Sequence, residues 1–307
     1  MKKITIIIPA YNSSKYLDDA IKSVITQNLN NYEILVVDDG STLEENNRYH
    51  EILANYCNVK LLTKENGGAA SARNFGVRQA TGELIAFLDS DDIWLDGKIS
   101  SQLEIINQNE DIGLVLGNII VADEALAAKY KSAKKIPEHK KKIINGFFKG
   151  EIVMNTPTIL VKKDIFDSIG GFPEDLKYRE DHFFLMSIAN ICKIRCDEKY
   201  LTVRRERKGS LSNVEDIDTE IAKHCPFWAK SKHAFPFVDV TEAKGKLLTK
   251  LYIYYLRNNR HEDILRTQAI ALMFDKRYWL LFLISSKLSW LIKMLYNYRI
   301  KFKNANL

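Results

Sequence analysis

The sequence of 307 residues lacks the features that mark several classes of protein. It has four cysteines and no CxxC pair, six prolines and 14 glycines. These counts exclude a disulfide-rich or collagen-like chain and argue against a zinc site, and we expect reduced thiols in the cytosol. No apolar run reaches the roughly 20 residues that span a bilayer. The opening run 4–8 is too short for a signal peptide and has no cleavage site, so it predicts a first strand.

Acidic residues are missing from two basic segments. Residues 129–142 hold seven lysines and one glutamate, and residues 276–307 hold seven basic residues and no acid. Such asymmetry predicts an anionic partner, either a membrane surface or a nucleic acid. Residues 129–142 show no periodicity and are interpreted as a mobile or surface insertion, solvated or in contact with acceptor or lipid. Aromatics and lysines in 278–298 favour an interfacial helix, with ordinary packing as the alternative. No nucleic-acid-binding module accompanies the charge.

Apolar runs and helical spacings alternate along the first part of the chain. We predict strands at 3–8, 33–37, 59–62, 84–88, 112–121, 158–161 and 194–206, with helices between most of them. This order indicates βαβ units and a mostly parallel sheet flanked by helices, an α/β fold. Beyond about residue 216 the pattern becomes helical, at 247–256, 264–274 and 278–298. The sequence therefore predicts an α/β domain followed by a helical extension.

Acids follow the predicted strands at two places. The second strand ends in Asp38 and Asp39, and the fourth ends in Asp89, Ser90, Asp91 and Asp92. Carboxylates are rarely buried without a partner, and their oxygens suit a hard cation such as Mg²⁺ or Mn²⁺. A single solvated acidic turn would need no ligand. Ligands bind beyond the carboxyl ends of parallel strands, so several polar ends at one edge favour a metal-dependent site.

Three other features leave two interpretations open. The turn at Gly67-Gly68 matches neither GxGxxG nor a P-loop, and Arg73 beyond it either meets phosphate or lies on a solvated helix face. Glu180 and Asp181 open a helix, where an acid either complements the helix dipole or serves as a general base. The sequence alone does not choose between these two acids. The arginines at 204, 205 and 207 precede either a solvated turn or a lid that neutralises a leaving phosphate.

Taken in order, these motifs resemble those of the GT-A fold glycosyltransferases of family 2, which are inverting enzymes that use nucleotide-diphosphate sugars. The matching segments are 4–12 (ITIIIPAYN), 37–41 (VDDGS), 66–74 (NGGAASARN), 87–92 (FLDSDD) and 180–181 (ED). Each is short, but five in family order over residues 3 to about 212 are specific. The resemblance implies the GT-A fold, with a Rossmann-like sheet. Residues 1–215 would form the catalytic domain, its nucleotide-sugar half at about 1–110 and its acceptor half at about 111–215, and 216–307 a basic helical extension.

The resemblance also implies the donor site and the metal. The donor nucleotide would be bound by Pro9, Tyr11, Asp39, Arg73, Asp89 and Ser90. Asp39 would accept a hydrogen bond from uracil, and Arg73 would lie near the uracil or the first phosphate. Asp91 would ligate Mn²⁺ or Mg²⁺, with Asp89 holding the ribose or supporting the metal. Asp92 is expected to cap the turn around Trp94.

Asp181 matches the catalytic base that takes a proton from the acceptor hydroxyl, and Glu180 would lie on the acceptor side. Relatives often carry a histidine after the arginine of the following strand, and this chain has none there. We expect Arg204, Arg205 or Arg207 to contact phosphate in its place.

The leading hypothesis is an inverting transferase that moves a sugar from a UDP-sugar to a glycan or lipid-linked acceptor in capsule, lipopolysaccharide or related surface-glycan synthesis. The basic tail would hold it on the cytoplasmic face of the inner membrane. A sugar nucleotidyltransferase is the alternative, although residues 9–12 are not its glycine-rich, lysine-bearing loop. A non-catalytic nucleotide-sugar-binding subunit is the third hypothesis.

Overall fold

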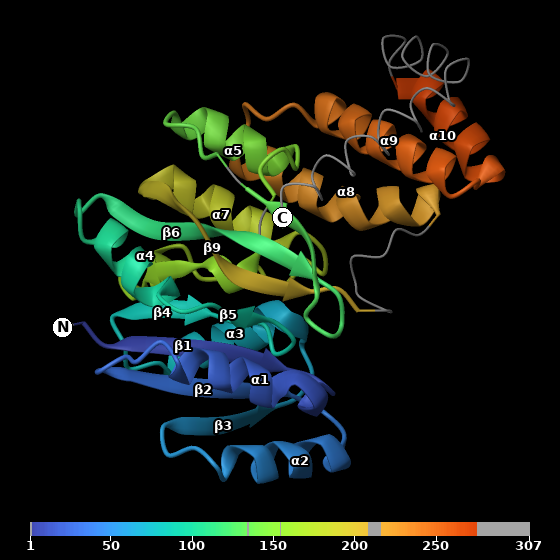
Figure 1. The fold of residues 1–307 in the computed structure, drawn as a ribbon. Helices are drawn as coiled ribbons and strands as arrows, with labels where there is room; N and C mark the ends of the chain where they lie inside the picture. The colour runs from blue at the N-terminus through green and yellow to red at the C-terminus, as the bar shows by residue number, and fades with distance from the viewer. Residues whose placement is uncertain (1, 134, 154, 208–215, 275–307) are drawn as a thin grey trace. The chain divides into compact units, whose positions relative to one another are not determined.

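The structure is a computed structural model that describes residues 2–133, 135–153, 155–207 and 216–274. The chain forms two compact units (Figure 1). The first comprises Met1–Phe147 and Ile152–Arg207, and the second comprises Phe148–Glu151 and Lys208–Leu307. The candidate site lies in the first unit.

The first unit is built on a nine-stranded sheet with the order β3-β2-β1-β4-β8-β6-β9-β5, and β7 pairs with β6 (Figure 1). The strands are β1 (Ile4–Ala10), β2 (Tyr32–Asp39), β3 (Val59–Lys64), β4 (Leu84–Phe87), β5 (Ile93–Trp94), β6 (Ile112–Ala122), β7 (Ala128–Ser132), β8 (Leu160–Lys162) and β9 (Lys193–Arg205). Strands β1 to β4 run parallel, as do β6 and β9, whereas β5, β7 and β8 are antiparallel to their neighbours. The predicted α/β fold with a mostly parallel sheet is confirmed.

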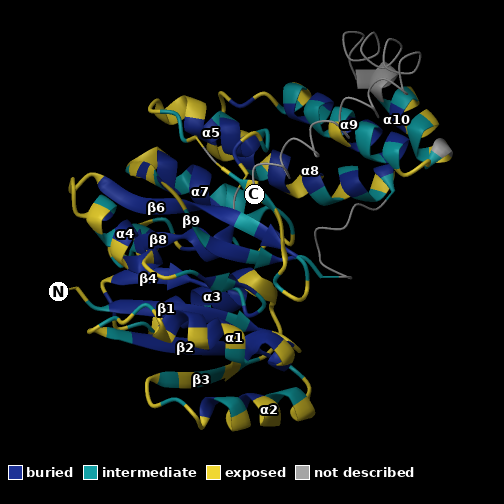
Figure 2. Cartoon of the chain, in the orientation of Figure 1, coloured by how far each residue is buried: buried dark blue, intermediate teal, exposed yellow. Residues whose placement is uncertain are grey.

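Helices cover both faces of this sheet. They are α1 (Ser14–Ile25), α2 (Leu43–Leu53), α3 (Gly68–Gln79), α4 (Lys98–Ile106), α5 (Lys140–Phe148), the 3-10 turn η1 (Thr156–Thr158), α6 (Lys163–Ser168) and α7 (Glu180–Ile191). Strands β1, β2, β4 and β6 are almost wholly buried, whereas α2 presents exposed residues to solvent (Figure 2). This contrast is what an apolar sheet between amphipathic helices predicts.

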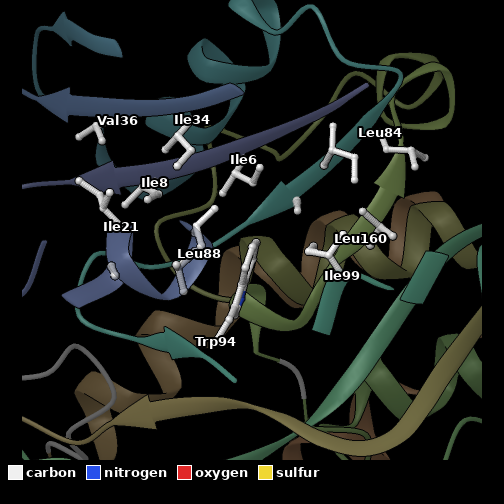
Figure 3. Packing of buried hydrophobic residues seen from close by; sticks show 14 of the residues in the cluster. Ile6, Ile8, Ile21, Ile34, Val36, Leu84, Leu88, Trp94, Ile99 and Leu160 are labelled. Atoms are coloured by element: carbon white, nitrogen blue, oxygen red, sulfur yellow. The ribbon is translucent and has the colours of Figure 1, made fainter. Parts of the chain in front are cut away.

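One face of the sheet packs against α1, α2 and α4. Every second residue of β1 and β2 points to this side, so Ile6, Ile8, Ile34 and Val36 meet Ile21 of α1 (Figure 3). Trp94 joins the same core, and its indole nitrogen donates to the carbonyl of Pro157 at 2.8 Å. The period-2 pattern of the strands thus matches the helical spacing of their partners.

The opposite face carries α3 very close to the strands. A Cβ atom at Gly76 would lie 2.7 Å from Ile7 and 3.1 Å from Val37, so only a hydrogen side chain fits there. Beside it, aromatic rings from β4, α6, the following loop and α7 form one cluster: Phe87, Phe166, Phe172 and Phe184. The cluster fixes α7, whose first turn carries two candidate site residues.

The lysine-rich segment 129–142 has regular structure, contrary to its interpretation as an insertion without periodicity. Strand β7 pairs with β6, and α5 begins at Lys140. The apolar residues that bury α5, Ile143, Ile144 and Phe147, lie just beyond the segment, and the pairing of β7 is a long-range contact. The sequence of residues 129–142 therefore contains neither the apolar residues that bury α5 nor the partner strand of β7. Its lysines at 129, 131, 135 and 140–142 are exposed, as the solvated-face interpretation requires.

The second unit contains α8 (Ile217–Ala234), α9 (Val240–Arg257) and α10 (His261–Phe274). Asp216 and Asp239 cap α8 and α9, accepting hydrogen bonds from backbone N–H groups of the first turns. Helix α8 was not among the predicted ranges, and it contains Pro226, which usually interrupts helices. The predicted interfacial helix at 278–298 lies outside the described residues. Within the described part, no helix is long and apolar enough to cross a bilayer.

Candidate functional site

The carboxyl ends of β1, β2 and β4 lie side by side at one edge of the sheet. Pro9 pairs in register with Val37 and Ala10 with Asp38, while the backbone N–H of Leu88 donates to the carbonyl of Ile7 at 3.1 Å. The loops that follow carry Tyr11, Asp39 and the Asp89–Asp92 turn. The predicted convergence of polar strand ends is therefore present, and it assembles the first half of the candidate site.

Asp39 is buried against the start of α3. Its Oδ1 accepts from Lys64 Nζ at 2.8 Å and from the Gly67 N–H at 3.0 Å, and its Oδ2 accepts from the Gly68 N–H at 2.7 Å. Gly40 makes the approach of the two loops feasible, because a Cβ there would lie 2.7 Å from the Asn66 nitrogen and its φ is +74°. A carboxylate has about four lone-pair sites, so Asp39 can still accept one further hydrogen bond.

Tyr49 of α2 connects the loops after β1 and β2. Its hydroxyl accepts from the Ser13 N–H at 2.9 Å and lies 3.3 Å from Ser41 Oγ. Ser90 donates to Ser13 Oγ at 2.9 Å, so the predicted nucleotide contact Ser90 already has a structural partner. Tyr11, in contrast, is 55% exposed and presents an aromatic ring at the site edge. Its exposure suits stacking on a base.

Arg73 is 5% exposed, which rules out the solvated helix face. Its Nη2 donates to Asp89 Oδ1 at 2.8 Å, and its Nη1 lies 3.5 Å from Glu180 Oε1. Nε and Nη1 have no hydrogen-bond partner among the described residues. A buried donor without a partner costs free energy, so these two nitrogens mark a place where a ligand acceptor fits.

The three arginines at 204, 205 and 207 differ in what they contact. Arg207 Nε lies 2.6 Å from Asp91 Oδ2, whereas Arg204 pairs with Glu206 at 3.2 Å. Arg205 is structural, because its side chain donates to the Asp91 and Glu124 carbonyls and lies over the ring of Tyr16. Of the predicted trio, Arg207 is therefore the one whose side chain pairs with a carboxylate of the acidic turn.

Asp92 does not cap the turn around Trp94, so this prediction is wrong. Its Oδ1 accepts from the Arg205 N–H at 2.8 Å, and the Trp94 N–H donates instead to Ser23 Oγ at 3.1 Å. The sequence could not reveal this partner, because Arg205 lies on a strand more than 100 residues away. Asp92 thus attaches the carboxyl end of β9 to the acidic turn.

The acidic turn holds more negative charge than its surroundings compensate. Burial, followed by the nearby Asp89 carboxylate, raises the pKa of Asp91. Burial and the neighbouring carboxylates of Asp91 and Asp89 raise the pKa of Asp92 well above its ordinary value. No group of three or more histidine, cysteine or acidic side chains in the described ranges is arranged to hold a metal ion by itself.

The second half of the site lies at the start of α7. Burial and the adjacent Asp181 raise the pKa of Glu180 to about 7. Burial acts on Asp181 in the same direction, but His182 and Arg73 outweigh it and lower the pKa of Asp181 to about 2. Asp181 Oδ1 accepts from the His182 N–H at 2.7 Å and from His182 Nδ1 at 2.8 Å. The sequence prediction did not include His182, because nothing in the sequence distinguishes it from an ordinary helix residue.

A family model described as glycosyl transferase family 2 matches residues 5–170, more than half of the chain. The chain belongs to glycosyl transferase family 2. The Escherichia coli glucosyltransferase WfgD is 32% identical over 198 residues, which cover 63% of this chain and 73% of WfgD. An uncharacterized glycosyltransferase of Rickettsia conorii is 26% identical over 301 residues, 94% of this chain and 49% of the relative. The chain thus spans about half the length of that relative.

Solved structures share the fold of this family 2 chain. TarS of S. aureus in complex with UDP-GlcNAc superposes with a TM-score of 0.60 at 23% identity, covering 91% of this chain and 79% of TarS. The mannosyltransferase PcManGT of Pyrobaculum calidifontis, in complex with GDP-Man and Mn²⁺, superposes with a TM-score of 0.55 at 15% identity, covering 99% and 87%. These likenesses confirm the GT-A-type fold.

The family match ends before the start of α7. It includes Tyr11, Asp39, Arg73 and the acidic turn, but not Glu180 or Asp181. The family match therefore says nothing about these two acids of the family 2 chain. The evidence for their roles is the geometry around Arg73, which contacts Asp89 on one side and Glu180 on the other.

Proposed function

We propose that this family 2 chain is an inverting glycosyltransferase that moves a sugar from a UDP-sugar to a hydroxyl group of a glycan or lipid-linked acceptor. The observation that carries the proposal is the environment of Arg73. It joins the acidic turn to the first turn of α7 and keeps two buried donor nitrogens without a hydrogen-bond partner among the described residues. A phosphate or a uracil carbonyl would satisfy both nitrogens.

The strand edge supplies the nucleotide site. Pro9 and the exposed ring of Tyr11 would contact the base, and Asp39 would accept its remaining hydrogen bond from the uracil N3–H. Asp89 and Ser90 follow β4 at the same edge, where ribose hydroxyls would meet them. The complex of TarS with UDP-GlcNAc and the UDP-Glc in the name of WfgD support a UDP-sugar as donor.

The acidic turn fits a divalent cation. Burial and repulsion between neighbouring carboxylates raise the pKa values of Asp91 and Asp92, and a hard cation would relieve that repulsion. Asp91 would hold Mn²⁺ or Mg²⁺, with Asp89 supporting it, and the Mn²⁺ of PcManGT supports this assignment. When bound, the ion supplies charge stabilisation to the leaving diphosphate. Arg207 would contact phosphate once it leaves Asp91.

Transfer would occur in a single displacement. Asp181 takes the proton of the acceptor hydroxyl while the acceptor oxygen bonds to the anomeric carbon, and the bond from that carbon to the diphosphate oxygen breaks. The electron pair leaves with UDP, and attack opposite the leaving group turns an α-linked donor into a β-linked product. Arg73 faces the pair Glu180 and Asp181 and the donor turn together, which brings proton acceptor and leaving group into one site.

The acceptor and location are inferred from chemistry and from relatives. WfgD acts, by its name, on a diphosphoundecaprenol-linked GlcNAc, which supports a lipid-linked acceptor and a role in surface-glycan assembly such as lipopolysaccharide or capsule. Residues 1–215 would be the catalytic domain. The basic residues 276–307, outside the described part, would hold 216–307 to anionic lipid on the cytoplasmic face of the inner membrane.

The test is UDP release from a panel of UDP-sugars with Mn²⁺ or Mg²⁺, with a membrane extract as acceptor. We expect one donor to be turned over, and we expect Asp91→Ala to remove the metal dependence with most of the activity. Asp96→Ala, on the exposed turn before α4, is the matched control. UDP binding without release from any sugar would favour the non-catalytic subunit, and pyrophosphate release from UTP would favour the nucleotidyltransferase.

A further inference from the structure

We propose that His182 is the positioning residue for the base Asp181, holding one carboxylate oxygen so that the other faces the acceptor hydroxyl. This inference rests on the proposed function. The two residues are adjacent at the start of α7, and both are partly buried, with Asp181 23% and His182 15% exposed at the side chain.

The first observation is the geometry of the pair. The His182 N–H and ring Nδ1 both approach the same oxygen, Oδ1 of Asp181, at 2.7 and 2.8 Å. An ionised carboxylate can only accept, so Nδ1 carries the hydrogen. Both hydrogen bonds that Asp181 receives from described residues end on Oδ1. The side chain is therefore fixed in rotation, and Oδ2 is the oxygen left to take a proton.

The second observation is the support of the imidazole itself. The ring of Phe147, at the end of α5, meets the ring of His182 edge-on, with centroids 6.4 Å apart and planes at 88°. Phe147 is fully buried, so this contact is part of the core rather than of a mobile surface. The orientation of the imidazole is thus set by α5, and that of the carboxylate by the imidazole. A base held in this way loses little entropy on reaching the reactive geometry.

The third observation is the charge around the pair. Arg73 from α3, Arg179 at the N-cap of α7 and the neighbouring Glu180 face Asp181. Arg73 is committed to Asp89 and Glu180, with its nearest contacts at 2.8 and 3.5 Å. Of the side chains that surround Asp181, His182 is the one that donates hydrogen bonds to it. An arginine alone would keep the base ionised without fixing which oxygen points to the acceptor.

Two substitutions separate positioning from packing. His182→Phe keeps a ring against Phe147 but removes the donor, whereas His182→Asn restores a nitrogen at the same distance along the side chain. We expect His182→Phe to lower kcat about 10- to 100-fold, below the roughly 10²–10⁴-fold loss of a removed base. We expect His182→Asn to recover at least tenfold of that loss. KM for the UDP-sugar and the calorimetric Kd for UDP stay within twofold in both variants.

Parallel loss of kcat and UDP affinity in His182→Phe would overturn the proposal, as would an unchanged kcat or equal defects in both variants. Phe183→Leu, one residue further along α7, is the control for helix packing.

A spectroscopic readout separates this proposal from the proposed function. In the full chain labelled with ¹⁵N-histidine, the His182 signal is identified by its loss in His182→Asn. The Asp181 carboxylate stabilises the imidazolium, so Asp181→Asn should move the His182 titration about one to three pH units lower. An unmoved titration contradicts the pair even if the enzyme is active. A moved titration in a chain that turns over no UDP-sugar keeps the pair and rejects the transferase.

Discussion

The carboxylates on the two sides of the site differ in the charged groups that surround them. On the strand edge, three carboxylates each pair with a basic side chain: Asp39 with Lys64, Asp89 with Arg73 and Asp91 with Arg207. At the start of α7, Glu180 and Asp181 lie side by side with Arg73 facing both. Their pKa values consequently separate, to about 7 for Glu180 and about 2 for Asp181.

This difference shows how one type of side chain takes several roles. A carboxylate that pairs with one basic side chain can exchange that protein cation for a metal ion. Two adjacent carboxylates that share one arginine cannot both be equally charged at little cost. Burial and repulsion act on Glu180, whereas Asp181 is relieved by His182. The contacts of each carboxylate, more than its residue type, therefore determine whether it suits ligand binding or proton transfer.

The largest effect is expected from removing the residue that the two sides share. Arg73→Met takes away the cation of Asp89 and Glu180 and the donors proposed for the nucleotide. We predict a fall in kcat/KM of about 10²–10³-fold, the range for a lost preorganised donor. Steady-state UDP release measures it, and Arg78→Met, an exposed position on the same helix, is the control. If kcat/KM of Arg73→Met stayed within tenfold of the wild-type value, Arg73 would not connect the two sides of the site.

A smaller effect is expected on stability at the α7 side. The pKa of Glu180 is raised by folding, so the folded protein binds this proton more tightly than the unfolded chain. Stability from this group is fully present below the unfolded pKa, near 4.5, and is lost as pH rises through about 7. Glu180→Gln removes that loss.

We predict that the variant gains about 1–3 kcal/mol relative to wild type between pH 5 and pH 8. Urea unfolding at both pH values measures this gain. Glu104→Gln, on an exposed face of α4, should show no such change, and a pH-independent difference for Glu180→Gln would contradict the raised pKa.

The smallest effect is expected where a cation is partly exposed. Arg207 contacts Asp91 but its side chain is 38% exposed, so water screens much of its charge. We predict that Arg207→Ala lowers kcat/KM about tenfold, less than the roughly 10²–10³-fold for a buried donor. Arg204→Ala, which loses only the contact with Glu206, is the paired control for UDP release. Equal losses of kcat/KM in the two variants would contradict the different roles of Arg207 and Arg204.

The strand-edge side of the site could be predicted from sequence because its signals are local. Each of Tyr11, Asp39 and Asp89 lies within two residues of the end of an apolar run, and parallel strands bring such ends together without knowledge of any distant contact. The fold followed from the same alternation of strands and helices. The boundaries shifted by one or two residues, as at β2, which extends to Asp39.

The α7 side could be predicted only in part. Acids in a first helical turn are common, and the division between Glu180 and Asp181 depends on Arg73, which lies more than 100 residues away. His182 and Tyr49 gave no signal, because a histidine or tyrosine within a helix is usually a packing residue. The partner of Asp92 on β9 was hidden for the same reason. Long-range pairing decides these roles, and it becomes visible only in the structure.

The central claim is that Asp181 provides the proton chemistry while the strand edge binds the donor. The most direct measurement is turnover of the accepted UDP-sugar by Asp181→Asn, together with calorimetric binding of UDP to the same protein. We predict that turnover falls about 10²–10⁴-fold while UDP affinity stays within a few-fold. Turnover at the wild-type rate, or loss of UDP binding together with turnover, would contradict this division of roles.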